Sequence, residues 1–515
     1  MAYIAYSTPK TNGSVYATVV ESCRKDGKVT QNRIENLGRV INQEMGIFKS
    51  RERGIYSYTL EKGVAEVSPK DMSSLGLGTP AAQSTKEKLI LDFGDSYILD
   101  RYIAALPIND AICDVLPDER DTLFSLLFYR ILTDKKANCH AMTWWVGNYA
   151  CMLFPKAQLS SQRVSEFMVR LGDESVQRVF FDRYLGILYG CRDEQAAAIL
   201  IDSSGLPNAS KMSVTQLNNH NGDISVEVRL IYVIDRQNGM PVYFRYCPGN
   251  IVDVSTLCTT IAELSQYNVN IDSAIVDAGY FSEPNVKELY DNGIHFISRL
   301  APNRTVFKEV TKKHLDDIDS AKHAIRYGGR LVYMKKDKID LYGYEGYAYI
   351  GVDMDSRSSQ VKKTTFNCMD DKLTPEETDL RISKLGLFVL LSSDDMDTKD
   401  VLPLYYTRQQ VEQVFDIAKN NADILPLRTQ NEDTFRGHLM LTFMAAAILQ
   451  KMQRDILTKR KKGDKTNPEG ALMKLRNQKC KVYDENIVPQ EAVKEINDVY
   501  KLLGIKCPTM IARVI

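Results

Sequence analysis

Four residues in the C-terminal third of the chain combine an aromatic hydroxyl, two cations and a carboxylate at helical spacing. They are Tyr405, Arg408, Glu412 and Lys419. At 100° per residue they fall at about 0°, 300°, 340° and 320° around one helix, in a stripe about 60° wide. Apolar residues on the adjoining arc would face a core. A helix that carries an acid and bases in one line is suited to meet a metal ion and a phosphate chain together.

Two aspartates stand where predicted strands end. Asp202 follows the apolar run 196–201, and Asp277 follows the short strand 273–276. If these strands are adjacent and parallel, their carboxyl ends lie side by side, where the ligands of open α/β sheets collect. Glu412 would complete the set from a helix packed on that sheet.

Three converging carboxylates favour a divalent cation. Without a counter-charge, Asp202, Asp277 and Glu412 would repel one another and their pKa values would rise. Oxygen ligands without His or Cys favour Mg²⁺ or Mn²⁺. Two such ions about 3.5–4 Å apart can hold the attacking and leaving oxygens of an in-line phosphoryl displacement. Arg408 and Lys419 would neutralise phosphates of the same strand.

Each of these residue types also has a structural role. An aspartate at a strand end is often a turn residue or a helix cap. A stripe of Glu, Arg and Lys is usually a solvated face with weak ion pairs. Tyr405 alone is typical of a partly buried anchor. Only the joint order and spacing favours a catalytic site.

The elements that would position these residues follow an α/β pattern. From about 193 to 300 the order is β-β-β-α-β-α-β, a meander followed by crossover helices. Residues 301–384 interrupt this pattern, which resumes with an apolar strand before the stripe. The predicted strands are 196–201, 224–234, 241–246, 273–276, 295–300, 331–334, 347–352 and 385–391, and the predicted helices include 255–267, 283–292, 375–384, 432–453 and 491–503.

The N-terminal part divides into three segments. The pattern of residues 1–66 predicts short strands, with a hairpin turn at Asp26–Gly27. Residues 67–88 are rich in Ser, Pro and Gly, which indicates a linker. Helical periods dominate residues 89–192, with helices expected at 118–133, 161–171 and 174–185. In the second of these helices, Arg163 is a candidate DNA contact, and a purely structural helix bundle explains the spacing equally well.

Composition narrows the class of protein. The chain has 515 residues with 66 basic and 66 acidic side chains, so the net charge indicates nothing about nucleic acid, which needs only a local basic face. The clearest local cluster, 459–462, suits either phosphates or a solvated helix end. The ten cysteines are scattered singly, which argues against a disulfide framework and against a zinc site. The N-terminus lacks a secretory pattern, and we expect a cytoplasmic protein.

These residues carry a family resemblance. The stripe resembles the Y-x2-R-x3-E-x6-K signature of bacterial insertion-sequence transposases of the DDE type. The upstream segments 201–204 and 276–280 are similar to that family's two acidic motifs, and 248–250 with Asp253 resembles a turn common in these enzymes. Residues 436–438 resemble the start of the helix after the signature. One branch of these transposases is also similar to this chain in three short segments, 27–29, 37–38 and 503–504. In this chain Ala278 stands where a basic residue is frequent.

The resemblance implies an α/β fold with an RNase H-like catalytic core. That core would comprise 193–300 and 385–455, split by a β-rich insertion at 301–384 and followed by a tail at 456–515. The small β-rich N-terminal segment and the helical region would bind DNA.

The resemblance also implies an activity. Asp202, Asp277 and Glu412 would be the catalytic metal ligands, and Tyr405 would contact the transposon-end strand together with Arg408 and Lys419. A dimer would act on double-stranded DNA in the bacterial nucleoid: water would cut at the element's end, and the freed 3′-hydroxyl would attack target DNA. Two other functions remain open, a Mg²⁺-dependent nuclease of the same fold and a domesticated DNA-binding protein without catalysis.

Overall fold

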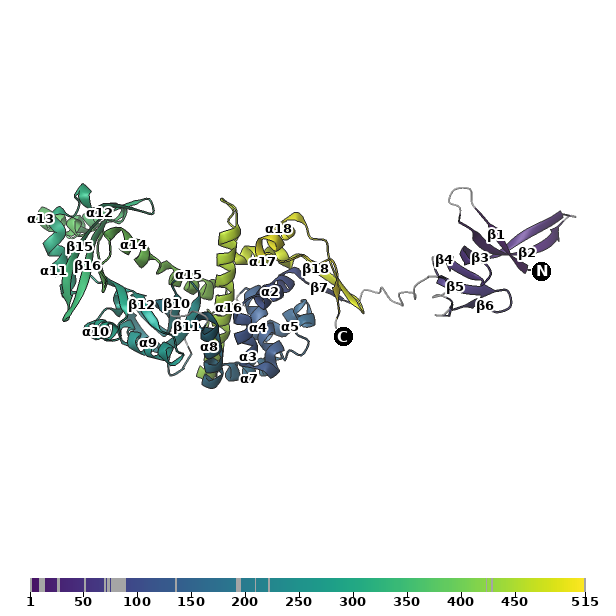
Figure 1. Cartoon of the computed structure of the whole chain (residues 1–515), viewed down its shortest axis with the longest axis horizontal. Coiled ribbons are helices and arrows are strands. Elements are labelled where there is room, and N and C mark those ends of the chain that lie inside the picture. The colour runs from purple at the N-terminus through teal and green to yellow at the C-terminus, as the bar shows by residue number, and fades with distance from the viewer. Residues whose placement is uncertain are drawn as a thin grey trace. The chain divides into compact units, whose positions relative to one another are not determined.

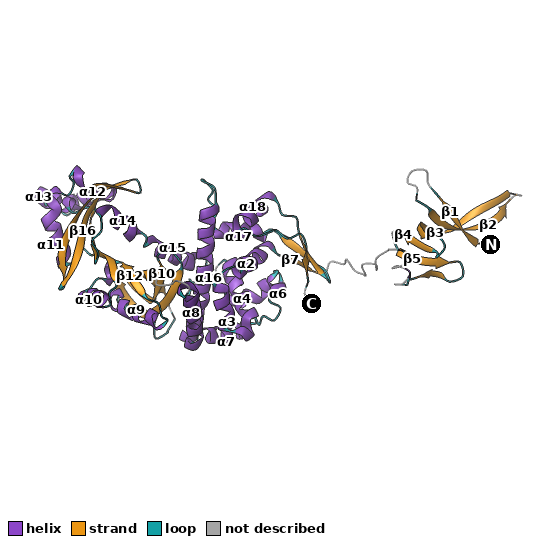
Figure 2. Ribbon diagram, in the orientation of Figure 1, coloured by secondary structure: helices purple, strands orange, loops and turns teal. Residues whose placement is uncertain are grey.

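The chain folds into two compact units, Met1–Glu87 and Lys88–Ile515 (Figures 1 and 2). The computed structural model describes residues 2–8, 14–25, 28–50, 52–68, 71, 75, 89–134, 137–190, 196–208, 210–220, 223–422, 424–427 and 429–513.

The first unit is an antiparallel sheet of six strands in sequence order. The strands are β1 (Ala2–Ser7), β2 (Tyr16–Lys25), β3 (Lys28–Asn42), β4 (Ile47–Ser50), β5 (Gly54–Thr59) and β6 (Gly63–Ala65). A small core of its own includes Leu37, Phe48 and Tyr56, and the hydroxyl of Tyr56 donates to the carbonyl of Leu37 at 2.8 Å. The predicted β-rich character is confirmed, and the predicted turn at Asp26–Gly27 lies outside the described residues.

The second unit begins with a strand that the sequence did not predict, β7 (Leu89–Asp92). It pairs with the C-terminal tail in the sheet β20-β19-β18-β7. Helices follow, and the predicted helices at 118–133, 161–171 and 174–185 are confirmed as α4, α7 and α8. The helices of this region are α2 (Gly94–Ala104), α3 (Ile108–Val115), α4 (Arg120–Leu132), α5 (Ala141–Val146), α6 (Ala150–Leu153), α7 (Ser161–Leu171) and α8 (Glu174–Tyr189), and the tail holds α17 (Pro468–Arg476), β18 (Lys479–Val482), β19 (Asn486–Pro489), α18 (Lys494–Leu503) and β20 (Ile511–Ala512).

The rest of the second unit contains a ten-stranded mixed sheet. Its strands follow the order β11-β10-β8-β12-β13-β17-β16-β15-β14, with β9 beside β10. Among the described strands of this sheet, only the pairs β8–β12 and β12–β13 are parallel. Its strands are β8 (Ala197–Pro207), β9 (Gln216–His220), β10 (Asp223–Asp235), β11 (Pro241–Pro248), β12 (Ile271–Val276), β13 (His295–Leu300), β14 (Ala324–Tyr327), β15 (Arg330–Leu341), β16 (Tyr344–Asp353) and β17 (Leu387–Ser392). With α9 (Leu257–Gln266) and α10 (Glu283–Asp291), this confirms the predicted alternation from 193 to 300 except for β9, which was not predicted.

Segment 301–384 holds helices as well as strands. Its strands β14–β16 continue the main sheet beyond β17. Around them lie α11 (Thr305–His314), α12 (Met354–Asp370) and α13 (Pro375–Ser383). The helix α13 confirms the prediction, whereas α11 and α12 were not predicted. In α12 only Cys368 is buried, so its sequence carries no apolar stripe of the kind that reveals a helix.

The long helix α16 (Glu432–Lys459) lies between the helical region and the main sheet (Figure 1). It is buried along most of its length by Leu, Met, Phe and Ala side chains. Near its N-terminus it meets α7 at two glycines. A methyl group on Gly437 would lie 2.0 Å from the carbonyl oxygen of Met168, and one on Gly172 would lie 2.2 Å from that of Asp433. Only glycine permits this close approach.

Candidate catalytic site

The register of two parallel strands brings the two aspartates together. Along β8 and β12 the last parallel pair is Ile201 with Val276. Asp202 and Asp277 directly follow this pair in the sequence, so they stand at the same edge of the sheet. The expectation that β8 ends before Asp202 is wrong, because β8 continues to Pro207 while paired antiparallel with β10.

The signature residues do not share one continuous helix. Tyr405 lies on α14 (Thr398–Tyr406), whereas Glu412 and Lys419 lie on α15 (Gln409–Asn420). Between the helices the amides of Thr407 and Arg408 donate to carbonyls three residues back, at 3.2 and 3.1 Å. This tighter turn shifts Tyr405 relative to α15, so the predicted single stripe is wrong in detail.

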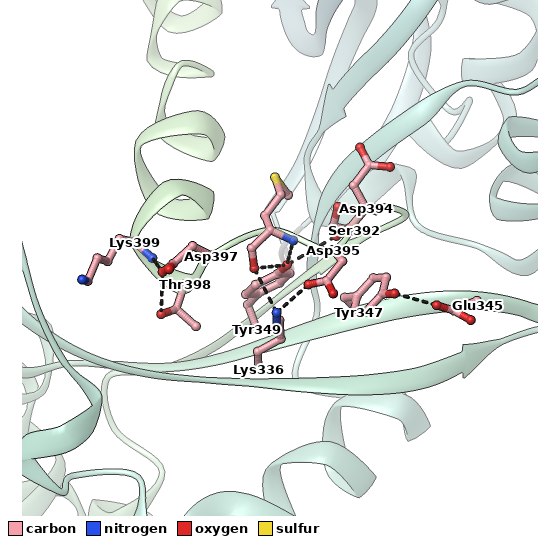
Figure 3. Close-up of polar contacts among 11 residues, drawn as sticks. Lys336, Glu345, Tyr347, Tyr349, Ser392, Asp394, Asp395, Asp397, Thr398 and Lys399 are labelled. Atoms are coloured by element: carbon pink, nitrogen blue, oxygen red, sulfur yellow. Dashed lines mark hydrogen bonds and ion pairs between the residues drawn. The ribbon is translucent and has the colours of Figure 1, made fainter.

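The start of α14 is held by the strands of segment 301–384 (Figure 3). The hydroxyl of Tyr349 on β16 accepts from the amide of Met396 at 2.7 Å, and Lys336 on β15 pairs with Asp395 at 2.5 Å. The carboxylate of Asp397 then caps α14 by accepting from the amide of Lys399 at 2.9 Å. These contacts tie the helix that carries the signature tyrosine to the sheet extension.

The guanidinium of Arg408 binds all three candidate acids. Its Nη1 lies 3.2 Å from Asp202 Oδ2 and 3.6 Å from Asp277 Oδ2, and its Nη2 lies 3.3 Å from Glu412 Oε1. The Asp202 side chain is 16% exposed and that of Glu412 is 59% exposed. The structure therefore gathers the three predicted acids around one cation. As arranged here, no three His, Cys, Asp or Glu side chains within the described ranges are close enough to share a metal ion.

Burial sets the electrostatics of this cluster. It raises the pKa of Asp202 to about 6, because the lost hydration of the carboxylate outweighs the attraction of Arg408, and the charge of Asp277 adds to the rise. Burial opposes the charge of Arg408, but the carboxylates, with Asp202 first, outweigh it and hold its pKa above the ordinary value. The site thus holds a buried acid, whose pKa is about 6, next to a permanent cation.

Tyr405 is an anchor within the site rather than part of an exposed stripe. It is 5% exposed, and its hydroxyl donates to Asp277 Oδ1 at 3.4 Å. Burial, and then the negative charge of Asp277, raises the pKa of the phenol. Tyr405 therefore orients the second aspartate as a neutral hydrogen-bond donor.

A cationic cavity lies beside this tyrosine. It has a volume of about 350 Å³, and its lining includes Tyr405, Arg299, Arg330 and Lys384. The carboxylate of Asp353 also lines it and accepts from Arg330 at 3.0 Å. The lining therefore carries three positive charges against one negative charge, which suits a polyanion.

Lys419 lies along β8, beyond the acids. Its Nζ donates to the hydroxyl of Ser204 at 2.6 Å and lies over the ring of Phe415. The ammonium is half-buried, and burial lowers its pKa. Ser204 was not predicted as its partner. The alternation of the strand contained the signal, because residues two apart, here Asp202 and Ser204, face the same side.

Arg163 is not one of the residues gathered around Arg408. It lies on α7 in the helical region, with its side chain 62% exposed and paired to Glu166 at 3.0 Å. The opposite face of α7 is buried. Arg170, on the same helix, forms a two-pronged pair with Glu119 at 2.8 and 2.5 Å.

Two family profiles match this chain. One, described as "Transposase DDE domain", matches residues 195–448, which include all three acids and the signature. The other, described as "IS1634 family transposase, N-terminal domain", matches residues 4–54 of the first unit. The chain is an insertion-sequence transposase of the DDE class. Its function is therefore transposition, with DNA as its substrate.

Other comparisons with the transposase are more distant. Among curated proteins none matches its sequence significantly. A solved structure of a piggyBac transposase synaptic complex with hairpin DNA is similar at 11% identity, with a TM-score of 0.40, over 74% of this chain and 79% of that one. No helix among the described residues is long and apolar enough to cross a membrane.

Proposed function

We propose that Asp202, Asp277 and Glu412 are the metal ligands of a phosphoryl-transfer site on an RNase H-like core. The observation that carries the proposal is the convergence of these acids, from two adjacent strands and one helix, on the single guanidinium of Arg408. Enzymes of the DDE class generally use divalent metal ions. The core would comprise 193–300 and 385–455.

The chemistry of the donors suits Mg²⁺ or Mn²⁺. All three groups are carboxylates that already surround a positive charge, and hard cations prefer oxygen ligands. Glu412 is exposed enough for its side chain to approach the aspartates. When bound, the metal would supply a Lewis acid that lowers the pKa of water and stabilises charge on the phosphate. For the acids to hold it together, Arg408 must leave its present position.

The remaining residues would guide the DNA strand. A displaced Arg408 would remain one helical turn before Glu412, where its planar group can pair with a phosphate. Lys419, on the same helix, would meet the strand further along β8. Tyr405 would act indirectly, by holding Asp277. The cationic cavity beside Tyr405 would extend this path.

Outside the core, we assign DNA binding to the β-rich segment 1–66 and to the helical region 89–192. The segment 67–88 would link them, and 301–384 and 456–515 would complete the enzyme as insertion and tail. Exposed Arg163 is the DNA contact that we propose on α7. The partners would be double-stranded transposon ends and target DNA, held by a homodimer.

A strand-transfer assay tests this function. The full-length transposase is incubated with Mg²⁺, a labelled pre-cut duplex of the element's terminal repeat and a supercoiled plasmid. We expect the labelled 3′-end to become joined to plasmid DNA. A parallel reaction contains an uncut duplex of the same end. Cleavage of the uncut duplex together with no joined product from the pre-cut duplex would contradict strand transfer and identify a nuclease instead.

A further inference from the structure

The two strand ends that carry the aspartates are bridged on the opposite side of the sheet. Asp202 and Ser204 face α15, so Ser203, between them on β8, faces the other way. The hydroxyl of Ser203 donates to Asp253 Oδ1 at 2.6 Å. Asp253 begins the turn after β11, in the segment 253–255.

The same carboxylate also lies close to the turn after the second aspartate. A methyl group on Gly279, two residues after Asp277, would lie 3.1 Å from Asp253 Oδ2. One oxygen of this side chain therefore accepts from the residue after Asp202, and the other lies close enough to the turn after Asp277 to crowd any side chain at position 279. Asn285 fastens the same two turns together, because its amide donates to the carbonyls of Val254 and Tyr280, both at 2.7 Å.

A buried arginine holds this bridge in place. Arg229 on β10 is paired with Gly205 of β8 and so shares the face of Ser203. Its Nε lies 3.3 Å from Asp253 Oδ1, and the two side chains are 9% and 19% exposed. Removing one partner of such a pair leaves an uncompensated buried charge, so the pair restrains the position of Asp253.

We propose that Asp253 and Arg229 are positioning residues that set the spacing between Asp202 and Asp277 for a shared metal ion. The inference rests on the proposed function, because it needs the two acids to act on one ion. Asp253 touches the turns from behind, on the face away from Arg408, and so supports the ligands without being one. Supporting residues of this kind typically change metal affinity about 10–100-fold when removed.

The test is Mn²⁺ binding by the full-length, DNA-free protein, measured by electron paramagnetic resonance. Asp253→Ala should weaken binding about 10–100-fold, and Asp253→Asn, which keeps the shape and the acceptor oxygen, should weaken it less. Asp272→Asn is the matched control, because Asp272 is an exposed acid on β12. Its affinity should equal that of the wild type. Thermal melting of each variant shows that the fold is retained.

Further variants keep the inference testable if Asp253→Ala does not fold. Ser203→Ala removes one contact of the bridge, and Gly279→Ala pushes against the other, so both should weaken Mn²⁺ binding. Wild-type affinity in Ser203→Ala, Gly279→Ala and Asp253→Asn together would overturn the positioning role. Asp202→Asn separates the two proposals: unchanged Mn²⁺ binding in that variant would overturn the metal site itself and this inference with it. Weakened binding in Asp202→Asn with wild-type binding in the Asp253 variants would overturn the positioning role alone.

Discussion

The Nη1 atom of Arg408 lies 3.2 Å from Asp202 Oδ2, and both side chains are only 16% exposed. The pair holds a positive charge at the point where the candidate catalytic carboxylates meet. A guanidinium there relieves the repulsion that three carboxylates would otherwise suffer. It also occupies the position that the proposed divalent ion would need, so metal binding would be coupled to the placement of Arg408.

Replacing the arginine should therefore favour the ion in the absence of DNA. Arg408→Gln removes a cation that competes with the metal for Asp202, Asp277 and Glu412. We expect Mn²⁺ to bind at least about tenfold more tightly to the DNA-free variant, since like charges a few ångströms apart repel by more than 1 kcal/mol even at an effective dielectric constant of 20. Cleavage should nevertheless fall, because a phosphate contact is lost. Weaker Mn²⁺ binding by the variant would contradict this competition.

The raised pKa of Asp202, about 6, predicts a pH dependence of stability. The folded protein takes up a proton near pH 6, whereas an unfolded aspartate does so near 3.9. The charged form in the fold is therefore disfavoured, and stability should increase as the pH falls from 7.5 to 5. In the presence of a chelator, the unfolding free energy of the wild type should rise by about 1 kcal/mol more than that of Asp202→Asn when the pH is lowered from 7.5 to 5. Denaturant melts at several pH values measure this difference, and a difference that does not change with pH would be inconsistent with the buried acid.

Variants of Lys419 distinguish a role of this lysine in cleavage from a purely structural role. Lys419→Met removes the hydrogen bond to Ser204, which contributes about 1 kcal/mol to stability. We expect a small loss in thermal melting together with a large loss of cleavage per folded molecule. Ser204→Ala, as the matched variant, should lose similar stability but retain the cation and most of the cleavage. Normal cleavage by Lys419→Met would assign the lysine to structure alone.

Arg163 tests the proposed DNA contact on α7. Arg163→Ala should weaken binding to the transposon end and lower the slope of log affinity against log salt by about one. Arg178→Ala is the control, because Arg178 on α8 is also exposed and paired within its helix, with Glu174. Equal salt slopes for the wild type and Arg163→Ala would favour the structural bundle instead.

The sequence was informative where side-chain patterns report burial directly. The apolar run before Asp202 and the short strand before Asp277 predicted two adjacent strands, and their parallel pairing brought the acids to one edge. The pattern of apolar residues could not predict where a strand ends when its two neighbouring strands pair with different lengths of it. The end of β8 was misplaced because its antiparallel partner β10 extends it beyond the parallel pairing with β12.

The signature segment shows a second limit. Thr407 and Arg408 are compatible with a helix, so nothing local distinguishes four-residue from three-residue hydrogen bonding. The burial of Tyr405 against Asp277 depends on contacts between elements far apart in the sequence. The same holds for β7, whose partner strand β18 lies almost 400 residues later.

The most direct test of the central claim is cleavage of a labelled transposon-end duplex in Mg²⁺ by Asp202→Asn, Asp277→Asn and Glu412→Gln. Mobility-shift measurements in parallel establish that each variant still binds the duplex. We predict that all three bind with nearly wild-type affinity and that cleavage falls at least about a thousandfold in each, because each removes a ligand of the same metal site. A variant of any one of these residues that remains bound and cuts at nearly the wild-type rate would contradict the assignment of these three acids.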